Sequence, residues 1–201
     1  MRCSGSSMMA RTGRMSSSST VYLNGAAALE AFHHNLKLRA CPRCGQTGHL
    51  IFHGALVGYG CQGSERQKRG QRVFCSNRHR KRGCGKTFAV LFSLLLKARI
   101  IPAALVATFL ATVLAGACRH AAWLSLCHGF SLESGYRLWR DWVSGQAYLR
   151  TWLCRKIPPP RPERIGDGLT QTWEHLRHAF AGRPCPVTAF QEHFQQPFFP
   201  N

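Results

Sequence analysis

Four cysteines in the first half of the chain have the residue type and spacing to hold a metal ion. Cys41 and Cys44 lie in the run CPRCG, where a proline and a glycine favour a tight turn that points two thiolates at one ion. Cys75 and Cys84 lie in the run FCSNRHRKRGCGKTF. Four thiolates are a ligand set typical of structural zinc, and they leave no coordination position for a substrate. We therefore predict one structural Zn²⁺ held by these four cysteines.

The second pair of cysteines is unusually spaced. Eight residues separate Cys75 from Cys84, whereas two separate the first pair, so the second turn must carry an insertion. Other donors compete for the ligand roles, namely Cys61, His49, His53 and His79. We favour an unliganded loop thiol for Cys61 and positions beside a strand for the first two histidines. His79 can join the site only if the insertion folds back on the ion.

Short elements must position these cysteines. The sequence predicts a short helix within 24–40, which leads into the first cysteine turn, and strands at 50–52, 72–74 and 86–91. So small a sheet has too little core of its own, and a structural zinc adds roughly 10 kcal/mol or more. Residues 41–92 therefore have the outline of a zinc ribbon, in which a basic loop joins the first two strands.

Positive charge dominates the composition. The 201 residues include 27 Lys and Arg but only 8 Asp and Glu, which gives a formal net charge of +19. Much of it falls in one stretch, at Arg66, Lys68, Arg69, Arg72, Arg78, Arg80, Lys81, Arg82 and Lys86. So dense a run repels itself unless phosphates neutralise it, and counterion release then gives salt-dependent affinity with little sequence preference. We predict double-stranded DNA as the partner, and an anionic membrane surface is the second candidate.

The runs CPRC and FCSNRHRKRGCGKTFAV together resemble the zinc ribbon at the start of insertion-element transposases, and of the small DNA-binding proteins that such elements encode beside them. The resemblance covers residues 41–90 and continues more loosely to about Arg155, and G-C-G-x-T-F is its most specific part. It implies that a helix-turn-helix follows the ribbon and binds the terminal repeats of the element. The gap between Cys75 and Cys84 departs from the family pattern.

The segment from Ile100 to Cys118 carries no charge and is almost long enough to span a membrane. Ala, Thr and Gly supply much of it, however, and basic segments flank both of its ends. We predict a buried helix with Pro102 in its first turn. Its expected inner face consists of Leu105, Phe109, Thr112 and Val113. A small membrane protein anchored through 100–118 is the alternative.

Helices at 119–127 and from Ser131 onward, joined by a turn at 128–130, give the pattern helix, turn, helix. The expected core stripe of the later helix consists of Leu132, Tyr136, Trp139 and Val143. Arg137 and Arg140 fall on the opposite face, which we predict to enter the major groove of DNA. The alternative is an ordinary amphipathic helix in a small bundle. Residues 93–156 are thus expected to form a helix-turn-helix-like domain.

The two ends of the chain are compositionally distinct. Residues 1–23 contain no acid and predict a disordered basic tail, with an organellar transit peptide as the alternative. Residues 157–201 predict a Pro-rich linker, a short helix over 168–181 and an irregular tail, whose aromatic residues dock on a partner or on the rest of the chain. Without a signal peptide, ten cysteines indicate a reducing compartment. We expect a cytoplasmic, nucleoid-associated protein.

The acidic residues do not suggest catalysis. After Cys84 they are Glu133, Asp141, Glu163, Asp167, Glu174 and Glu192, all on predicted helices or linkers. A transposase that cuts DNA would need carboxylates mounted on a sheet to hold metal ions. The expected fold is small α+β, a four-cysteine zinc ribbon followed by an all-α helix-turn-helix-like bundle.

We accordingly expect a non-enzymatic, zinc-dependent DNA-binding protein of a transposable element, with no small-molecule substrate. Its further partner would be a separately encoded transposase or a second copy of itself. A truncated remnant of a transposase fits the same residues. The alternative from another class is a zinc-ribbon adaptor that binds protein or RNA.

Overall fold

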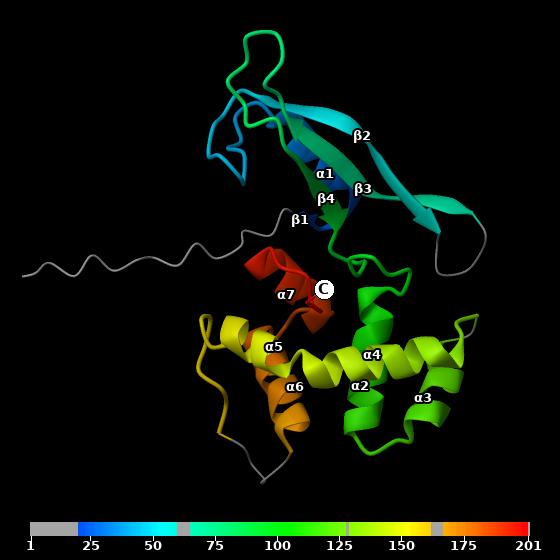
Figure 1. The fold of residues 1–201 in the computed structure, drawn as a ribbon. Coiled ribbons are helices and arrows are strands. Elements are labelled where there is room, and N and C mark those ends of the chain that lie inside the picture. Colours follow the sequence, from blue (N-terminus) through cyan, green and yellow to red (C-terminus); the bar gives the residue numbers. More distant parts are fainter. Residues whose placement is uncertain (1–19, 60–64, 128, 162–166, 201) are drawn as a thin grey trace, which may run out of the picture.

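The computed structural model describes residues 20–59, 65–127, 129–161 and 167–200. These residues form a four-stranded sheet with one helix in the N-terminal part and six further helices in the C-terminal part (Figure 1). We name residues 20–95 the sheet half and residues 96–200, which begin with the first member of the helical core, the helical half. The predicted α+β class is confirmed. The predicted basic tail lies, up to residue 19, outside the described residues.

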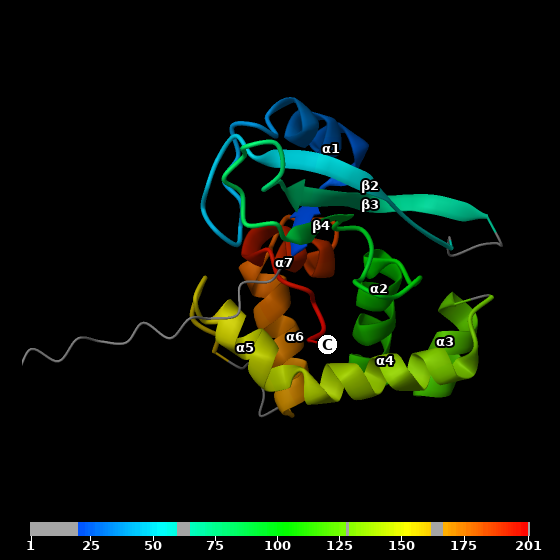
Figure 2. The same cartoon turned by 45° about the horizontal axis from the view of Figure 1, so that its top comes forward.

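The sheet has the strand order β1-β4-β3-β2. Its strands are β1 (Thr20–Leu23), β2 (Leu50–Tyr59), β3 (Arg66–Cys75) and β4 (Thr87–Phe92). β1 runs parallel to β4, and the other neighbours are antiparallel. Helix α1 (Gly25–His34) covers one face and lies behind the sheet in Figure 1 and above it in Figure 2. A small core between them contains Val73 and Phe88 from the sheet with Leu29 and Phe32 from the helix.

Two predictions about the strands need correction. Arg66, Lys68 and Arg69 were expected on a loop, but they belong to β3, which pairs with β2 along most of its length, whereas Arg72 lies in this strand as predicted. The outer part of this hairpin is exposed, so its sequence lacks the alternation that normally marks a strand. Residues 20–23 were assigned to the tail but form β1. Their partner is β4, and a pairing across so long a separation leaves no local signal.

The helical half has one continuous core. Its helices are α2 (Ala103–Leu114), α3 (Arg119–Leu126), α4 (Leu132–Ser144), α5 (Gln146–Leu153), α6 (Gly168–Ala179) and α7 (Pro186–Phe194). The core runs from Leu96 to Phe199, and Trp123, Trp142 and Phe198 are among its fully buried side chains. The prediction of an irregular C-terminal tail is wrong, because α7 forms there. The aromatic residues of this segment pack on the rest of the chain.

Pro102 was predicted in the first turn of this helix, and it occupies the N-cap position directly before α2. Phe109 is buried as expected, but the remaining buried positions are Ala103, Val106, Ala107 and Leu110. Leu105, Thr112 and Val113, which were expected inside, are only half-buried. Among the described helices, none combines the length and the apolar character that crossing a membrane requires.

Half of the predicted core stripe of α4 is wrong, although Leu132 and Trp139 do pack against the core. Tyr136 and Val143 are 47% and 45% exposed, whereas Gly135, Leu138 and Trp142 are buried. The cause lies at Gly135, where a Cβ would come within 2.6 Å of the ring of Trp123. Because glycine lets this large ring pack against the backbone, α4 turns that side inward. A periodicity count that treats glycine as neutral misses this face.

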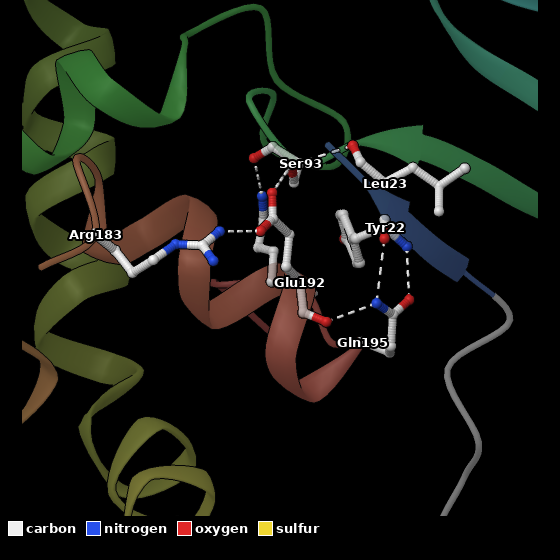
Figure 3. Close-up of polar contacts among 7 residues, drawn as sticks. Tyr22, Leu23, Ser93, Arg183, Glu192 and Gln195 are labelled. Atoms are coloured by element: carbon white, nitrogen blue, oxygen red, sulfur yellow. Dashed lines mark hydrogen bonds and ion pairs between the residues drawn. The ribbon is translucent and has the colours of Figure 1, made fainter. Parts of the chain in front are cut away.

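Helix α7 joins the two halves through polar contacts (Figure 3). The side-chain amide of Gln195 pairs with the exposed edge of β1, since its oxygen accepts from Tyr22 N at 2.8 Å and its nitrogen donates to Tyr22 O at 3.1 Å. The hydroxyl of Ser93, just after β4, lies 2.7 Å from the carboxylate of Glu192, which also pairs with Arg183. The sheet half is therefore attached to the bundle at specific points.

Candidate metal centre

Four thiols meet at the end of the sheet where β3 ends and where β2 and β4 begin. The sulfurs of Cys41, Cys44, Cys75 and Cys84 all lie within 4.8 Å of one another. The Cys41 and Cys84 sulfurs are 3.9 Å apart, and the Cys44 and Cys75 sulfurs are 3.7 Å apart. Tetrahedral Zn–S bonds of about 2.3 Å place sulfurs about 3.8 Å apart. The four residues that the sequence singles out therefore lie at the spacing of a tetrahedral metal site.

The first cysteine turn is closed by its own backbone. Cys41 N donates to Gln46 O at 2.8 Å, and Gly45 N donates to Cys41 O at 2.8 Å. Arg43 N points at the Cys41 sulfur from 3.5 Å. Gly45 has a φ of +74°, a left-handed conformation that glycine adopts without strain. The CPRCG run thus places two sulfurs on one side of a compact loop.

The second cysteine turn repeats the first with additional residues. Cys75 N donates to Lys86 O at 2.9 Å, and Gly85 N donates to Cys75 O at 2.9 Å, with a φ of +68° at Gly85. Cys84 N points at the Cys75 sulfur from 3.3 Å. Lys86 lies eleven positions after Cys75, whereas the equivalent residue of the first turn, Gln46, lies five positions after Cys41. The wide spacing is therefore an ordinary cysteine turn that carries six extra residues.

The extra residues, 77–82, leave and rejoin the turn at one point. Gly83 N donates to Ser76 O at 3.0 Å and closes the base of the insertion. A Cβ at Gly83 would lie 2.3 Å from Ser76 O and 2.8 Å from the Cys75 sulfur, so a side chain at this position would displace a ligand. The insertion is thus fixed directly to the sulfur cluster. It carries four cations, namely Arg78, Arg80, Lys81 and Arg82.

The competing histidines lie elsewhere. His79 is exposed at the turn of the insertion, with a φ of +51°. His53 packs against Phe74, with ring centroids 5.8 Å apart. Neither they nor His49 belong to the sulfur cluster, and Cys61 lies outside the described residues. Within the described ranges, the cluster therefore consists of cysteines alone.

The environment of the thiols differs from one to the next. A hydrogen bond from the backbone of Gln46 lowers the pKa of exposed Cys44 to about 7. Burial raises the pKa of Cys75 to about 12, and it also raises the pKa of Cys41. Burial therefore favours the neutral form of these two thiols. Metal binding at this cluster must release protons, so acid opposes it.

The cations predicted to contact DNA occupy different environments. Exposed side chains belong to Arg66, Lys68, Arg72, Arg78, Arg80, Arg82 and Lys86. Arg78 lies over the ring of Phe74, 5.8 Å from its centroid. Half-buried Arg69 differs from the others, because it donates to Leu96 O and Arg99 O in the segment before α2. Burial lowers the pKa of Arg69, and its guanidinium forms hydrogen bonds within the chain. Lys81 is half-buried as well.

On α4, Arg137 and Arg140 are both exposed, as the sequence predicts. Arg137 forms an ion pair with Glu133 one turn earlier, at 3.2 Å. Asp141 pairs with Arg99, so the segment before α2 is tied to this helix. Helices α3 and α4 pack through Trp123 and Gly135, and His128 of the predicted turn lies outside the described residues. DNA contact by α4 stays a prediction.

Comparison with known proteins adds no relative. The chain matches no protein-family model, no curated protein and no solved structure.

Proposed function

We propose that the chain is a non-enzymatic DNA-binding protein whose sheet half is folded by one structural Zn²⁺. The observation that carries the proposal is the four-sulfur cluster at tetrahedral spacing, from which the cationic insertion 77–82 projects. A metal at this cluster would fix the base of the insertion through Ser76 and Gly83. Its positive side chains would then be held in one arrangement, and ordering them would cost less on binding.

Charge supports a polyanionic partner. The insertion contains four cations and no acid, and the chain as a whole carries a formal charge of +19. Phosphate contacts release counterions from the duplex, so affinity falls as salt rises, with a slope of about −0.9 per phosphate neutralised. A surface of this kind binds the DNA backbone and positions the protein without specifying a sequence.

The place of this activity in a transposable element is supported by the resemblance of the cysteine runs to insertion-element zinc ribbons. On this proposal the protein binds the ends of an element, and α4 contributes Arg137 and Arg140 to the contact. Catalysis would come from a separately encoded transposase.

The test combines metal content with salt-dependent binding. Native mass spectrometry of protein purified without added zinc should give one zinc per chain. Binding to a random-sequence 30-base-pair duplex, measured at several salt concentrations, should show a steep slope. Replacing Arg80 and Arg82 by Gln removes two exposed charges from the insertion, so the slope should fall by about two units. The matched control replaces Arg161 and Arg177 by Gln, because both side chains are exposed in the helical half.

Two results would count against the proposal. If the zinc-loaded protein leaves the duplex unbound at low salt, DNA is not its partner, and binding to RNA instead would favour the adaptor alternative. If both double variants change the slope equally, net charge alone governs binding and the insertion has no special role.

A further inference from the structure

The outer end of the β2–β3 hairpin projects from the sheet as a two-stranded arm. β4 pairs with β3 only from Gly70 to Phe74. Beyond that point Lys68, Gln67 and Arg66 pair with Val57, Gly58 and Tyr59 of β2 and with no third strand. We call residues 57–59 and 66–69 the arm. Figures 1 and 2 show β2 and β3 extending past the end of β4, away from α1.

The arm exposes an unusual set of side chains. Val57 and Tyr59 are 53% and 55% exposed, and they stand among the large apolar residues that the described structure leaves in solvent. The guanidinium of Arg66 lies 5.9 Å from the centroid of the Tyr59 ring, and Lys68 is exposed opposite Val57. No residue of the arm is acidic, although Glu65 precedes it. Apolar side chains thus lie beside cations on the arm, and within the described part of the chain they are exposed.

We propose that this arm enters the major groove of duplex DNA, which rests on the proposed DNA-binding function. The groove is about 12 Å wide and about 8.5 Å deep, and it admits a two-stranded ribbon. Strands lie about 4.8 Å apart, so the two strands of the arm fit side by side within this width. Tyr59 and Val57 would contact thymine methyl groups, while Arg66 and Lys68 would bind guanine edges or phosphates.

The root of the arm is fixed to the helical half. The Arg69 guanidinium binds Leu96 O and Arg99 O, and Arg99 pairs with Asp141 of α4. Gly58 makes room for this arginine, because a Cβ there would lie 2.6 Å from Arg69 Cδ. Arg69 therefore acts as a positioning residue that sets the direction of the arm relative to α4.

The surface beside this anchor is also cationic. A pocket of about 380 Å³ separates the segment 97–101 from α4, and its lining includes Lys97 and Arg137. Lys97 and Arg137 thus line the same pocket as Arg99, whose carbonyl oxygen anchors Arg69. The phosphate backbone of a duplex bound by the arm would extend toward α4.

The experiment blocks the major groove chemically. Affinity is compared for a random-sequence 30-base-pair duplex and for the same duplex with every cytosine replaced by glucosylated 5-hydroxymethylcytosine, whose sugar fills that groove. The zinc-loaded wild type should bind the modified duplex at least tenfold more weakly, while the minor-groove ligand netropsin should leave binding unchanged. Val57→Thr with Tyr59→Thr keeps strand-forming residues and should abolish the tenfold difference. Leu38→Thr with Leu124→Thr, at exposed apolar sites off the arm, should preserve it.

The outcomes separate the two proposals. If the wild type binds both duplexes equally while retaining its steep salt slope, the arm does not enter the major groove, and the DNA-binding function still stands. An arm variant that keeps the tenfold difference overturns the proposal as well. If arm variants change only the oligomeric state in sedimentation, the arm joins copies of the chain instead. Failure of the wild type to bind any duplex removes both proposals.

Arg69 is tested separately because its role is indirect. Arg69→Lys keeps the charge but cannot donate to two carbonyls from one planar group. We expect the salt slope to stay unchanged and the discrimination against the glucosylated duplex to fall several-fold. An equal loss of affinity for both duplexes would show that Arg69 supplies only charge.

Discussion

The two halves of this protein are stabilised by different means. The helical half encloses a large aromatic core in which Trp123, Trp142 and Phe198 are fully buried. The core of the sheet half is a single layer between α1 and one face of the sheet, and two of its buried members, Cys41 and Cys75, belong to the thiol cluster. Burial of apolar surface can stabilise the helical half, whereas on the proposed function the sheet half depends on a metal bound at the thiol cluster.

The difference explains where the protein can display charge. The cationic insertion and the arm both belong to the sheet half, and none of their residues is a member of the main apolar core. A cross-link by metal fixes loops without burying them, so their side chains remain available to a partner. The bundle instead supplies a rigid base, to which α7 attaches the sheet through Gln195 and Ser93.

The strongest test of this contrast is loss of a metal ligand. Cys84→Ser should remove most of the roughly 10 kcal/mol that a structural zinc supplies. We expect the sheet half to unfold while the helical half remains folded. Amide hydrogen exchange followed by mass spectrometry should show lost protection in peptides from 41–92 and retained protection in α2 and α4. Cys154→Ser, at an exposed thiol, should change neither region.

The converse test weakens the aromatic core. Trp142 is fully buried, stacks 6.2 Å from Phe198 and meets Trp173 edge-on, so Trp142→Ala should cost about 3–5 kcal/mol. The denaturation midpoint of the helical half should fall while zinc content is retained. Tyr136→Ala on the same helix is the control and should cost less than about 1 kcal/mol, because that side chain is half-exposed. A larger loss of stability for Tyr136→Ala would instead indicate that Tyr136 contributes to the core, as the predicted stripe has it.

Coupling between the halves is tested at Gln191. Its buried side-chain amide donates to Ser93 O at 2.7 Å and to Leu95 O at 3.1 Å. Gln191→Leu leaves these carbonyls unpaired and should cost about 1–3 kcal/mol. In urea, tryptophan fluorescence reports the helical half and zinc release reports the sheet half, and their midpoints should separate further than in the wild type. Gln67→Leu, at an exposed strand position, is the control, and equal shifts would contradict a specific coupling.

The smallest expected effect concerns the start of α6. Asp167 accepts from Thr170 N at 2.8 Å, and this hydrogen bond lowers the pKa of its carboxyl below the ordinary 3.8. Asp167→Ala should therefore cost about 1 kcal/mol at neutral pH. Because the folded-state pKa is depressed, this contribution is complete above 3.8 and is lost as pH falls through the lowered value. Thermal melts at neutral pH and at a pH below the lowered pKa should show this loss of stability. Asp167→Asn should keep a side-chain cap, but its stability should lack this pH dependence.

The sequence was informative where chemistry is local. The cysteine spacing predicted all four members of the sulfur cluster, and Pro102 predicted the start of α2. The exposed positions of Arg137 and Arg140 followed from the helical repeat of α4. The C-x8-C gap alone was ambiguous, since no local rule shows that Ser76 and Gly83 pair at the base of an insertion.

Other features depended on contacts between distant segments. β1 forms because it pairs with the edge of β4. The buried face of α4 is set by the packing of Trp123 of α3 against Gly135. Arg69 was grouped with the DNA-binding cations, but its carbonyl partners at Leu96 and Arg99 engage it within the fold. Its charge alone could not distinguish an anchor from a contact residue.

The sequence by itself determined the α+β class, the thiol cluster and the excess of positive charge, because residue type and short spacing fix which donors and charges are present. Only the tertiary structure decided that the presumed basic loop is partly a projecting arm and that the C-terminal aromatic residues complete a core. The physical reason is that strand pairing and side-chain burial depend on partners supplied by segments far away in the chain.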